Sequence, residues 1–397
     1  MGRIGEGARW ARDAAPWRPS NMRLLFANRP WHDRSRDDIG EEIRLQAAAG
    51  WLCRAQDATT DGGISWGYRM LSGWAPSYPE TTGYIVPTFL TLAAATGDAS
   101  FVTRAERCIG FLEGVQQGDG SFPAGTTASP REPSVFNTAQ IIAGLAAWIR
   151  ATGDERVVRM ARSAADWLVA MQDDDGAWRR GGYSAYPVTY TAHASCWLAE
   201  LGVDLRERRY IEAAARHLDW VMRQQDSTTG WFERSGFTAA DHQAHRAVTH
   251  TLAYTLWGVI HTGALLDRAD AITAALRPAR SLAELVLTTG ELPGVVDASW
   301  QGRAGYACLT GNAQMALTWM RLTELDPDPR FAAAARQVLQ SVGAAQLVTA
   351  SNPGVRGGIP GSDPVWGDYI RFALPNWSAK FYVDCLLARR PDAPADA

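Results

Sequence analysis

The segment QQGDGSF (residues 116–122) decides the fold, because variants of it recur along the chain. The other copies are QDATTDGGISW (56–66), QDDDGAW (172–178) and QDSTTGW (225–231). Each copy begins with Gln at the expected end of a helix, passes through a glycine turn and ends on an aromatic residue. Glycine is used in such turns because it adopts a positive φ without a steric penalty. The recurrence predicts a helical unit that is repeated several times.

Between these loops, apolar helical stretches end at glycine, the residue type most often found just past a helix. The stretches TLAAATG, AAWIRATG, WLAELG and WGVIHTG end at Gly97, Gly153, Gly202 and Gly263. Their spacing of about 50 to 60 residues suits two helices and one long loop per unit. The unit is therefore expected to be a helical hairpin.

Extending this frame along the chain gives six hairpins. Outer helices with one apolar face are expected near residues 38–56, 99–116, 155–172, 206–225, 266–288 and 327–346. Inner helices that are apolar almost all round are expected near residues 80–96, 136–152, 189–201, 248–262, 308–324 and 376–389. An amphipathic helix lies on a core, whereas a wholly apolar one is covered on most sides. The alternation predicts two concentric rings, an all-α (α/α)6 toroid, over residues 38–397. Residues 1–37 are expected to be an N-terminal extension that packs on the barrel.

The composition excludes some classes of partner. The chain has 397 residues, 46% hydrophobic and 20% charged, with a formal net charge of −3, so no nucleic acid partner is expected. No stretch reaches the roughly 18 apolar residues of a membrane helix, and the N-terminus lacks the apolar core of a secretory signal. The five scattered cysteines fit a reducing compartment. We expect a cytoplasmic protein without a transmembrane segment, and the oligomeric state stays open.

No cofactor or metal is expected. His242 and His245 have a weakly zinc-like spacing, but no Cys or further His lies near them in the sequence. The unusual feature of the composition is its 17 Trp residues, many of them next to glycine in loops. Flat apolar side chains of this kind suit the faces of sugar rings or isoprenoid chains.

The glycine-turn loops resemble the QxxDGxW repeat of squalene-hopene cyclases and of protein prenyltransferase β subunits. This resemblance implies a shared toroid scaffold. The DxDD acid motif of those cyclases does not occur in this sequence. No Asp, Cys and His constellation for the zinc of the prenyltransferases is apparent either. The resemblance therefore implies nothing about the reaction.

Three longer strings, THTLAYTLWG (249–258), CLTGNAQMALTWMRL (308–322) and PNWSAKFYVDCLL (375–387), resemble uncharacterised bacterial (α/α) toroid proteins associated with polysaccharide biosynthesis. Glucuronyl C5-epimerases, alginate-type lyases and several glycoside hydrolase families also use helical toroids. The resemblance implies a carbohydrate-related role, and it transfers no catalytic residue to this chain.

The first turns of the inner helices carry polar residues in register. Counting back thirteen positions from each of the four helix-ending glycines gives Tyr84, Gln140, Thr189 and His250. A hydrophobic core would place Leu or Ala at such positions. These residues therefore predict a polar pocket at one mouth of the inner ring.

Candidate site residues come from these helix starts and from the loop GGIPGSDPVWGDYIRF (357–372). The candidate catalytic residues are Glu80, Tyr84, His250 and Tyr254. The candidate substrate-binding residues are Tyr78, Asn137, Gln140, Tyr190, His193, Asn312, Gln314, Trp366, Asp368, Arg371, Asn376, Trp377 and Lys380. The long aromatic loop is more than a connector needs. Its alternative interpretation is a plug that seals the ring.

These residues favour a carbohydrate-active enzyme that acts on an oligo- or polysaccharide, or its precursor, containing uronate. Neutral Tyr, His, Asn and Gln outnumber carboxylates at the mouth, which favours proton abstraction of the C5-epimerase or lyase type. Tyr84, Tyr254 or His250 would act as base and acid. The carboxylate of the uronate would be held by Asn137, Gln140 or Arg371.

Three alternatives remain open. Glycoside hydrolysis needs two carboxylates on either side of the scissile bond, and Glu80 with Asp363 or Asp368 is the pair we nominate. The repeat and the aromatic residues are compatible with a terpene-cyclase-like enzyme that handles isoprenoids. A non-catalytic glycan-binding protein of an export system is the third alternative.

Overall fold

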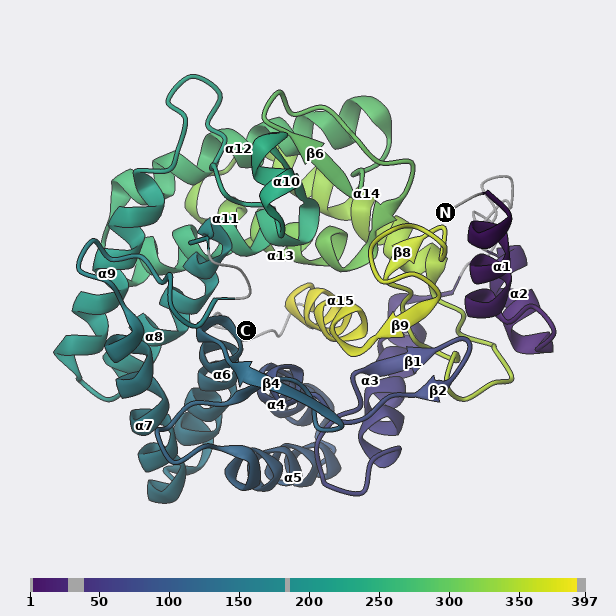
Figure 1. Ribbon diagram of the computed structural model, residues 1–397, viewed down its shortest axis with the longest axis horizontal. Helices are drawn as coiled ribbons and strands as arrows, with labels where there is room; N and C mark the ends of the chain where they lie inside the picture. Colours follow the sequence, from purple (N-terminus) through teal and green to yellow (C-terminus); the bar gives the residue numbers. More distant parts are fainter. Residues whose placement is uncertain (1–2, 28–38, 183–185, 391–397) are drawn as a thin grey trace.

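The computed structural model describes residues 3–27, 39–182 and 186–390. Within them, an inner ring is formed by α4 (Pro79–Thr96), α6 (Val135–Thr152), α8 (Ala192–Asp204), α11 (Thr249–Leu265), α13 (Leu309–Leu325) and α15 (Asn376–Ala388). Each of these helices contacts the next one, and α15 returns to α4, so the ring is closed (Figure 1). A one-turn helix, η1 (Thr189–Thr191), precedes α8.

The outer ring is formed by α3 (Glu41–Asp57), α5 (Ser100–Val115), α7 (Glu155–Met171), α9 (Arg208–Met222), α12 (Ala269–Thr289) and α14 (Pro329–Ala345). Each outer helix packs on an inner helix next to it in the chain, except that α3 packs on the last inner helix, α15. The two termini of the ring thus meet. This arrangement confirms the (α/α)6 toroid that the sequence predicts.

The two rings differ in burial as their sequence patterns indicate. In α6 every residue from Val135 to Trp148 is buried. In α7 the buried residues, among them Val157, Ala161 and Leu168, recur at helical spacing on one face. Inner helices also approach one another closely at glycine. A Cβ on Gly144 would lie 2.1 Å from the carbonyl oxygen of Gly83 in α4, so no side chain fits there.

The glutamines of the recurring loops fasten successive outer helices together. Gln116 Nε2 donates to the carbonyl of Gly120 in its own turn (3.0 Å) and to that of Met160 in α7 (3.0 Å). The same pair of hydrogen bonds is made by Gln56, Gln172 and Gln225. Gln346 also makes such a pair, with the carbonyls of Gly357 and of Arg44 in α3. The repeat therefore serves the framework. The sequence did not show the Gln346 copy, because its turn lacks the Asp-Gly pattern.

Two of the predicted glycine helix ends are confirmed, and two are wrong. Gly97 and Gly153 adopt left-handed φ values of 71° and 68° directly after α4 and α6. Gly202 and Gly263 instead lie inside α8 and α11, which continue to Asp204 and Leu265. At these two positions the glycine permits close packing, since a Cβ on Gly202 would lie 2.8 Å from Ile211 of α9.

Short strands lead into four inner helices and so lie at one end of the ring. The strand pairs are β1 (Gly67–Arg69) with β2 (Gly73–Trp74) and β9 (Ala373–Pro375), β3 (Pro123–Thr126) with β4 (Ser129–Pro133), β5 (Arg246–Val248) with β6 (Val295–Asp297), and β7 (Ala307–Cys308) with β8 (Ser362–Asp363). A short helix, α10 (Ala239–Gln243), precedes β5. These strands surround the N-terminal ends of the inner helices, which we call the mouth of the ring.

Two N-terminal helices, α1 (Arg3–Ala14) and α2 (Pro19–Ala27), lie beside this framework (Figure 1). Asn21 Nδ2 donates to the carbonyl of Met70 at 2.9 Å, and the ring of Trp10 meets that of Phe372 at 5.5 Å. Within the described residues, no helix has the length and apolar character needed to cross a membrane.

Candidate active site

The polar positions in register lie at the mouth and are buried. Tyr84, Gln140, Thr189 and His250 are all less than one tenth exposed. Thr189 differs from the others, because its hydroxyl donates to the carbonyl of Glu233 at 3.0 Å and so supports a loop. The other three belong to a continuous group of polar and aromatic side chains, which we describe from its carboxylate end.

Glu80 lies in the first turn of α4 and is 7% exposed. The hydroxyl of Tyr78 donates to Glu80 Oε2 at 2.6 Å, and Asn137 Nδ2 lies 3.4 Å from that hydroxyl oxygen. Among the described residues, Glu80 is the only buried carboxylate. This corner therefore combines one acidic group with the aromatic ring of Tyr78, whose edge meets the ring of Trp377 at 6.3 Å.

His193 of α8 and His250 of α11 contact the same tyrosine. Their imidazole centroids lie 4.3 Å and 4.5 Å from the ring of Tyr254. Phe136 of α6 packs against Tyr254 at 5.1 Å and against His193 at 6.3 Å. The helices α6, α8 and α11 are neighbours in the ring, so their first turns bring these side chains together.

Each of the two histidines is held by a glutamine from a neighbouring helix. Gln140 Nε2 lies 2.8 Å from His193 Nδ1, and Gln314 Oε1 lies 2.6 Å from His250 Nδ1. The remaining amide atoms, Gln140 Oε1 and Gln314 Nε2, are enclosed and have no hydrogen-bond partner in the part of the chain described. Among the same residues, neither histidine Nε2 makes a hydrogen bond.

The loop 357–372 brings one aromatic side chain into this group and turns two charged ones outwards. The ring of Tyr369 lies 5.3 Å from that of His250 with the ring planes tilted by 54°, and its hydroxyl accepts a hydrogen bond from Trp377 Nε1 at 2.9 Å. Asp368 and Arg371 form an ion pair at 2.5 Å, with 70% and 57% of their side chains exposed. Trp366 is partly buried against the core.

Burial dominates the protonation of the group. It lowers the pKa of His250 to about 4, against a smaller opposing effect of the hydrogen bond to Gln314. It also lowers the pKa of His193 well below the usual value, helped by the charge of Lys380. Burial raises the pKa of Tyr84 well above the usual value, with further contributions from Tyr254 and Glu80. At neutral pH both imidazoles are therefore uncharged, and the phenol of Tyr84 keeps its proton.

Three other predicted binding residues have polar partners in the framework. Asn312 Nδ2 lies 3.4 Å from Ser341 Oγ in the outer helix α14. Asn376 Nδ2 donates to the carbonyl of Ser65 and to Thr81 Oγ1. Lys380 is ion-paired with Asp384 one turn along α15, and its ammonium lies 4.4 Å from the centre of the Phe381 ring.

Several residues of the group were not predicted. Tyr369 was noted in its loop but not assigned to the site, and Phe136, Phe237 and Phe381 were not singled out. Phe237 reaches Tyr190 at 5.8 Å and His250 at 6.2 Å, and Phe381 reaches Tyr84 at 5.8 Å. An apolar ring in a predicted helix or loop carries no sequence signal that separates a site wall from the core.

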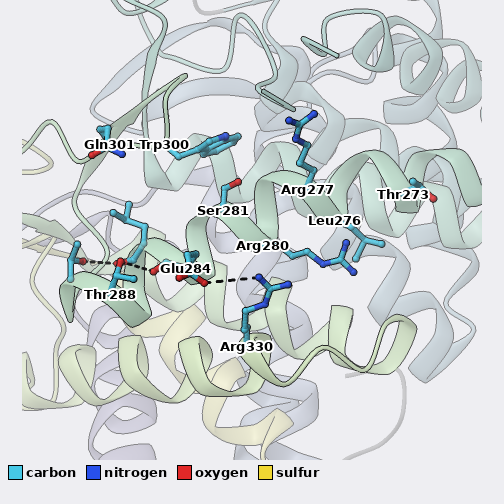
Figure 2. A pocket seen from close by; sticks show the side chains of 12 residues that line it. Thr273, Leu276, Arg277, Arg280, Ser281, Glu284, Thr288, Trp300, Gln301 and Arg330 are labelled. Atoms are coloured by element: carbon cyan, nitrogen blue, oxygen red, sulfur yellow. Dashed lines mark hydrogen bonds and ion pairs between the residues drawn. The ribbon is translucent and has the colours of Figure 1, made fainter. Parts of the chain in front are cut away.

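A hollow lies on the outside of the toroid, between α12, α14 and the loop after β6 (Figure 2). Its volume is about 850 Å³. Arg330 pairs with Glu284 at 4.0 Å and with Asp328 at 2.7 Å, and Arg280 pairs with Asp328 at 3.1 Å. Two arginines that line the hollow, Arg280 and Arg330, are thus paired with carboxylates. None of the predicted site residues lines it.

The described residues contain no group of three or more His, Cys, Asp or Glu arranged to hold a metal ion. His242 Nε2 lies 2.9 Å from the carbonyl of Gly236, and His245 Nδ1 lies 3.0 Å from the carboxylate of Glu233. These two side chains are therefore engaged with protein groups.

The toroid is shared by enzymes of different chemistry, so a match to a protein family defines the class here. Residues 73–277, just over half of the chain, match the family described as Beta-L-arabinofuranosidase, GH127 catalytic domain. The chain belongs to this family and is an enzyme that acts on carbohydrates. None of the curated proteins compared with the chain matches it.

Solved structures support the fold. An unsaturated glucuronyl hydrolase specific for heparin superimposes with a TM-score of 0.70 and 15% identity, over 88% of this chain and 97% of that one. Cellobiose 2-epimerase from Bacillus thermoamylovorans B4167 gives a TM-score of 0.69 and 12% identity, over 87% and 97%. An unsaturated glucuronyl hydrolase from Bacillus sp. GL1 gives 0.65 and 16%, over 89% and 98%. At these identities the likeness concerns the toroid alone.

Proposed function

We propose that the mouth removes a proton from a carbon next to a carbonyl or carboxyl group of a saccharide, as an epimerase or a lyase does. The observation that carries this proposal is the pair of buried, uncharged histidines on the ring of Tyr254. A general base needs a lone pair at working pH and access to the reacting proton. An imidazole whose pKa is lowered to about 4 keeps its lone pair throughout the neutral range.

In this proposal His250 is the base. One of its ring nitrogens is bound by Gln314, which fixes the ring, and the other makes no hydrogen bond among the described residues. Tyr84 and Tyr254 are the proton donors. A tyrosine with a raised pKa, as at Tyr84, keeps its proton until a strongly basic group develops beside it, which suits the return of a proton to a carbanion or a leaving oxygen.

The aromatic rings and amides of the mouth supply binding. Tyr78, Trp377 and Tyr190 offer flat apolar surfaces for a sugar ring, and Asn137 offers polar contacts to hydroxyls. A uronate-containing oligo- or polysaccharide is the substrate class we propose. Its carboxylate would make the hydrogen on the neighbouring carbon removable.

Hydrolysis is the second candidate, and the family match favours it. In this candidate Glu80, whose carboxylate accepts a hydrogen bond from the Tyr78 hydroxyl at 2.6 Å, would be the acid or the nucleophile. A hydrolase of the usual type needs a second carboxylate within about 5 to 9 Å. Asp368 is turned to solvent in an ion pair with Arg371, so Asp363 is the partner that this candidate retains.

Solvent-isotope incorporation separates the two candidates. The protein is incubated in D2O with a panel of uronate-containing oligosaccharides and with arabinofuranosides, and the products are read by NMR and mass spectrometry. Proton abstraction predicts deuterium on a ring carbon or a new ultraviolet-absorbing double bond. Hydrolysis predicts a new reducing end and no carbon-bound deuterium. If the active protein gives only the second outcome, the primary proposal is wrong.

A further inference from the structure

The two glutamines approach their histidines in opposite senses. At His193 the atom that faces Nδ1 is the amide nitrogen of Gln140, at 2.8 Å. At His250 the atom that faces Nδ1 is the amide oxygen of Gln314, at 2.6 Å. An amide N–H only donates and an amide oxygen only accepts. The two Nδ1 atoms must therefore play opposite roles.

Each role decides where the single proton of a neutral imidazole resides. His193 Nδ1 accepts from Gln140, so its proton is on Nε2. His250 Nδ1 donates to Gln314, so its Nε2 carries the lone pair. Both rings are buried, and burial keeps both uncharged. The hydrogen bond at Nδ1 thus determines what each Nε2 can do.

The contact with the histidine is the one hydrogen bond that each amide side chain makes among the described residues. Gln140 Oε1 and Gln314 Nε2 are enclosed and have no hydrogen-bond partner among the described residues. A buried amide atom without a partner is unfavourable. Each amide therefore makes its hydrogen bond at the histidine while its other end stays unsatisfied. Gln346 Oε1 in the framework shares the unsatisfied end, so the contact with the histidine is what carries the inference.

We propose that Gln140 and Gln314 are positioning residues that hold His193 and His250 in opposite tautomers. In this arrangement His250 is the base of the site, and His193 is an uncharged hydrogen-bond donor to the oxygen on which negative charge develops. This inference rests on the proposed proton abstraction and divides the two histidines into different roles.

The step balances as follows. The C–H bond next to the substrate carbonyl or carboxyl group breaks, and its proton goes to His250 Nε2. The electron pair of that bond forms a carbon–carbon double bond and moves charge onto the substrate oxygen. His193 Nε2–H donates a hydrogen bond to this oxygen and keeps its proton, because losing it would leave an imidazolate. An uncharged histidine is known to polarise a carbonyl in this way. The proton returns from His250 or from a tyrosine hydroxyl.

Imidazole nitrogen NMR tests the tautomers without any substrate. The protein is labelled with 15N-histidine, and long-range proton–nitrogen correlations are recorded at neutral pH. The variants His193→Gln and His250→Gln assign the two rings by the loss of their signals. We expect His193 to carry its proton on Nε2 and His250 to carry it on Nδ1. Finding the same tautomer in both rings, or a doubly protonated ring, overturns the inference.

One substitution at two positions supplies a matched control. A carboxylate only accepts hydrogen bonds, so Gln140→Glu forces His193 to place a proton on Nδ1, whereas Gln314→Glu leaves the tautomer of His250 as it is. We expect the first variant to change the His193 signals and the second to keep the His250 pattern. A common response at both positions contradicts the inference. A variant that does not fold is replaced by the Met substitution at the same position, which releases the histidine there from its single tautomer.

Activity gives the second readout. Gln140→Glu moves the proton of His193 from Nε2 to Nδ1 and so removes the hydrogen-bond donor to the developing oxyanion. We therefore expect kcat to fall by about 100-fold with little change in KM. The two proposals fail separately. Opposite tautomers with neither deuterium exchange nor a new double bond in any substrate would refute the proposed function alone. Deuterium exchange in a protein whose histidines share one tautomer would refute this inference alone.

Discussion

Two buried histidines in different parts of the toroid show why burial alone does not identify a site. His217 lies on the outer helix α9, and burial lowers its pKa to about 4, as it does for His250 at the mouth. His217 packs on Trp178 at 4.2 Å, much as His250 packs on Tyr254 at 4.5 Å. The two histidines have the same charge state and similar aromatic surroundings.

They differ in what their ring nitrogens contact. His217 Nδ1 lies 2.9 Å from the carbonyl of Gly176, and its Nε2 lies 3.0 Å from Thr191 Oγ1, so both nitrogens are used by the framework. In His250 and in His193, one nitrogen is held by a glutamine, and the other makes no hydrogen bond among the described residues. A ring nitrogen that the framework does not use is what distinguishes the mouth.

The largest effect expected from this comparison is on catalysis. Replacing His250 with Asn removes the proposed base, so the rate of product formation or deuterium exchange should fall by about 10²- to 10⁴-fold. The measurement is a steady-state rate on the substrate found in the isotope experiment. His217→Gln is the matched control and should retain a rate close to that of the unaltered protein. Equal losses in both variants would remove the distinction between the two regions.

The next effect is on stability. His217→Ala removes a fully buried ring, two contacts to its nitrogens and its packing on Trp178. We expect the free energy of unfolding to fall by about 2 to 4 kcal/mol. Chemical denaturation followed by circular dichroism measures it. A smaller loss for His250→Ala is expected, since one of its nitrogens has no framework partner among the described residues. The reverse order would contradict the assignment of His217 to the framework.

The pH dependence of stability gives a third test. The pKa of His217 is lowered from an unfolded value near 6.5 to about 4. Below about pH 6.5 the unfolded chain therefore binds a proton at this position that the native state does not bind until about pH 4. The contribution of this group to the free energy of unfolding is fully present above pH 6.5. It falls with decreasing pH by about 1.4 kcal/mol per pH unit until about pH 4.

The variant His217→Gln isolates that contribution. Its unfolding free energy should decline less steeply between pH 6.5 and pH 4 than that of the unaltered protein, and the two curves should run parallel above this range. Curves that stay parallel below pH 6.5 would mean that the native state binds a proton as readily as the unfolded chain.

The toroid follows from the sequence because its signals are local and repeated. The combination of a glutamine, a glycine turn and an aromatic residue marks the end of a helix each time it recurs. Apolar and amphipathic patterns distinguish the inner ring from the outer ring. The candidate residues in register come from the same spacing, since Tyr84, Gln140 and His250 each stand where an inner helix would otherwise carry an apolar residue. Their roles at the mouth stay predictions.

The remainder of the site depends on contacts between distant segments. That Gln314 meets His250, or that Tyr369 meets Trp377, depends on how α11, α13 and the loop before α15 pack, and no spacing in the chain reports it. The same limit explains Asn376. Its position at a helix start suggested substrate binding, whereas its amide joins Ser65 and Thr81 across the closure of the ring.

The smallest effect is expected at the exposed edge of the mouth, where the sequence offered Asp368 as a catalytic carboxylate. Asp368 is 70% exposed and paired with Arg371, and ion pairs in such positions contribute about 0.5 kcal/mol or less. Asp368→Asn should therefore leave both the rate and the free energy of unfolding nearly unchanged. Glu80→Gln is the comparison, because Glu80 is buried and hydrogen-bonded to Tyr78. A rate loss at Asp368 as large as that at Glu80 would favour the two-carboxylate mechanism over proton abstraction and would move the reacting atoms away from the histidines.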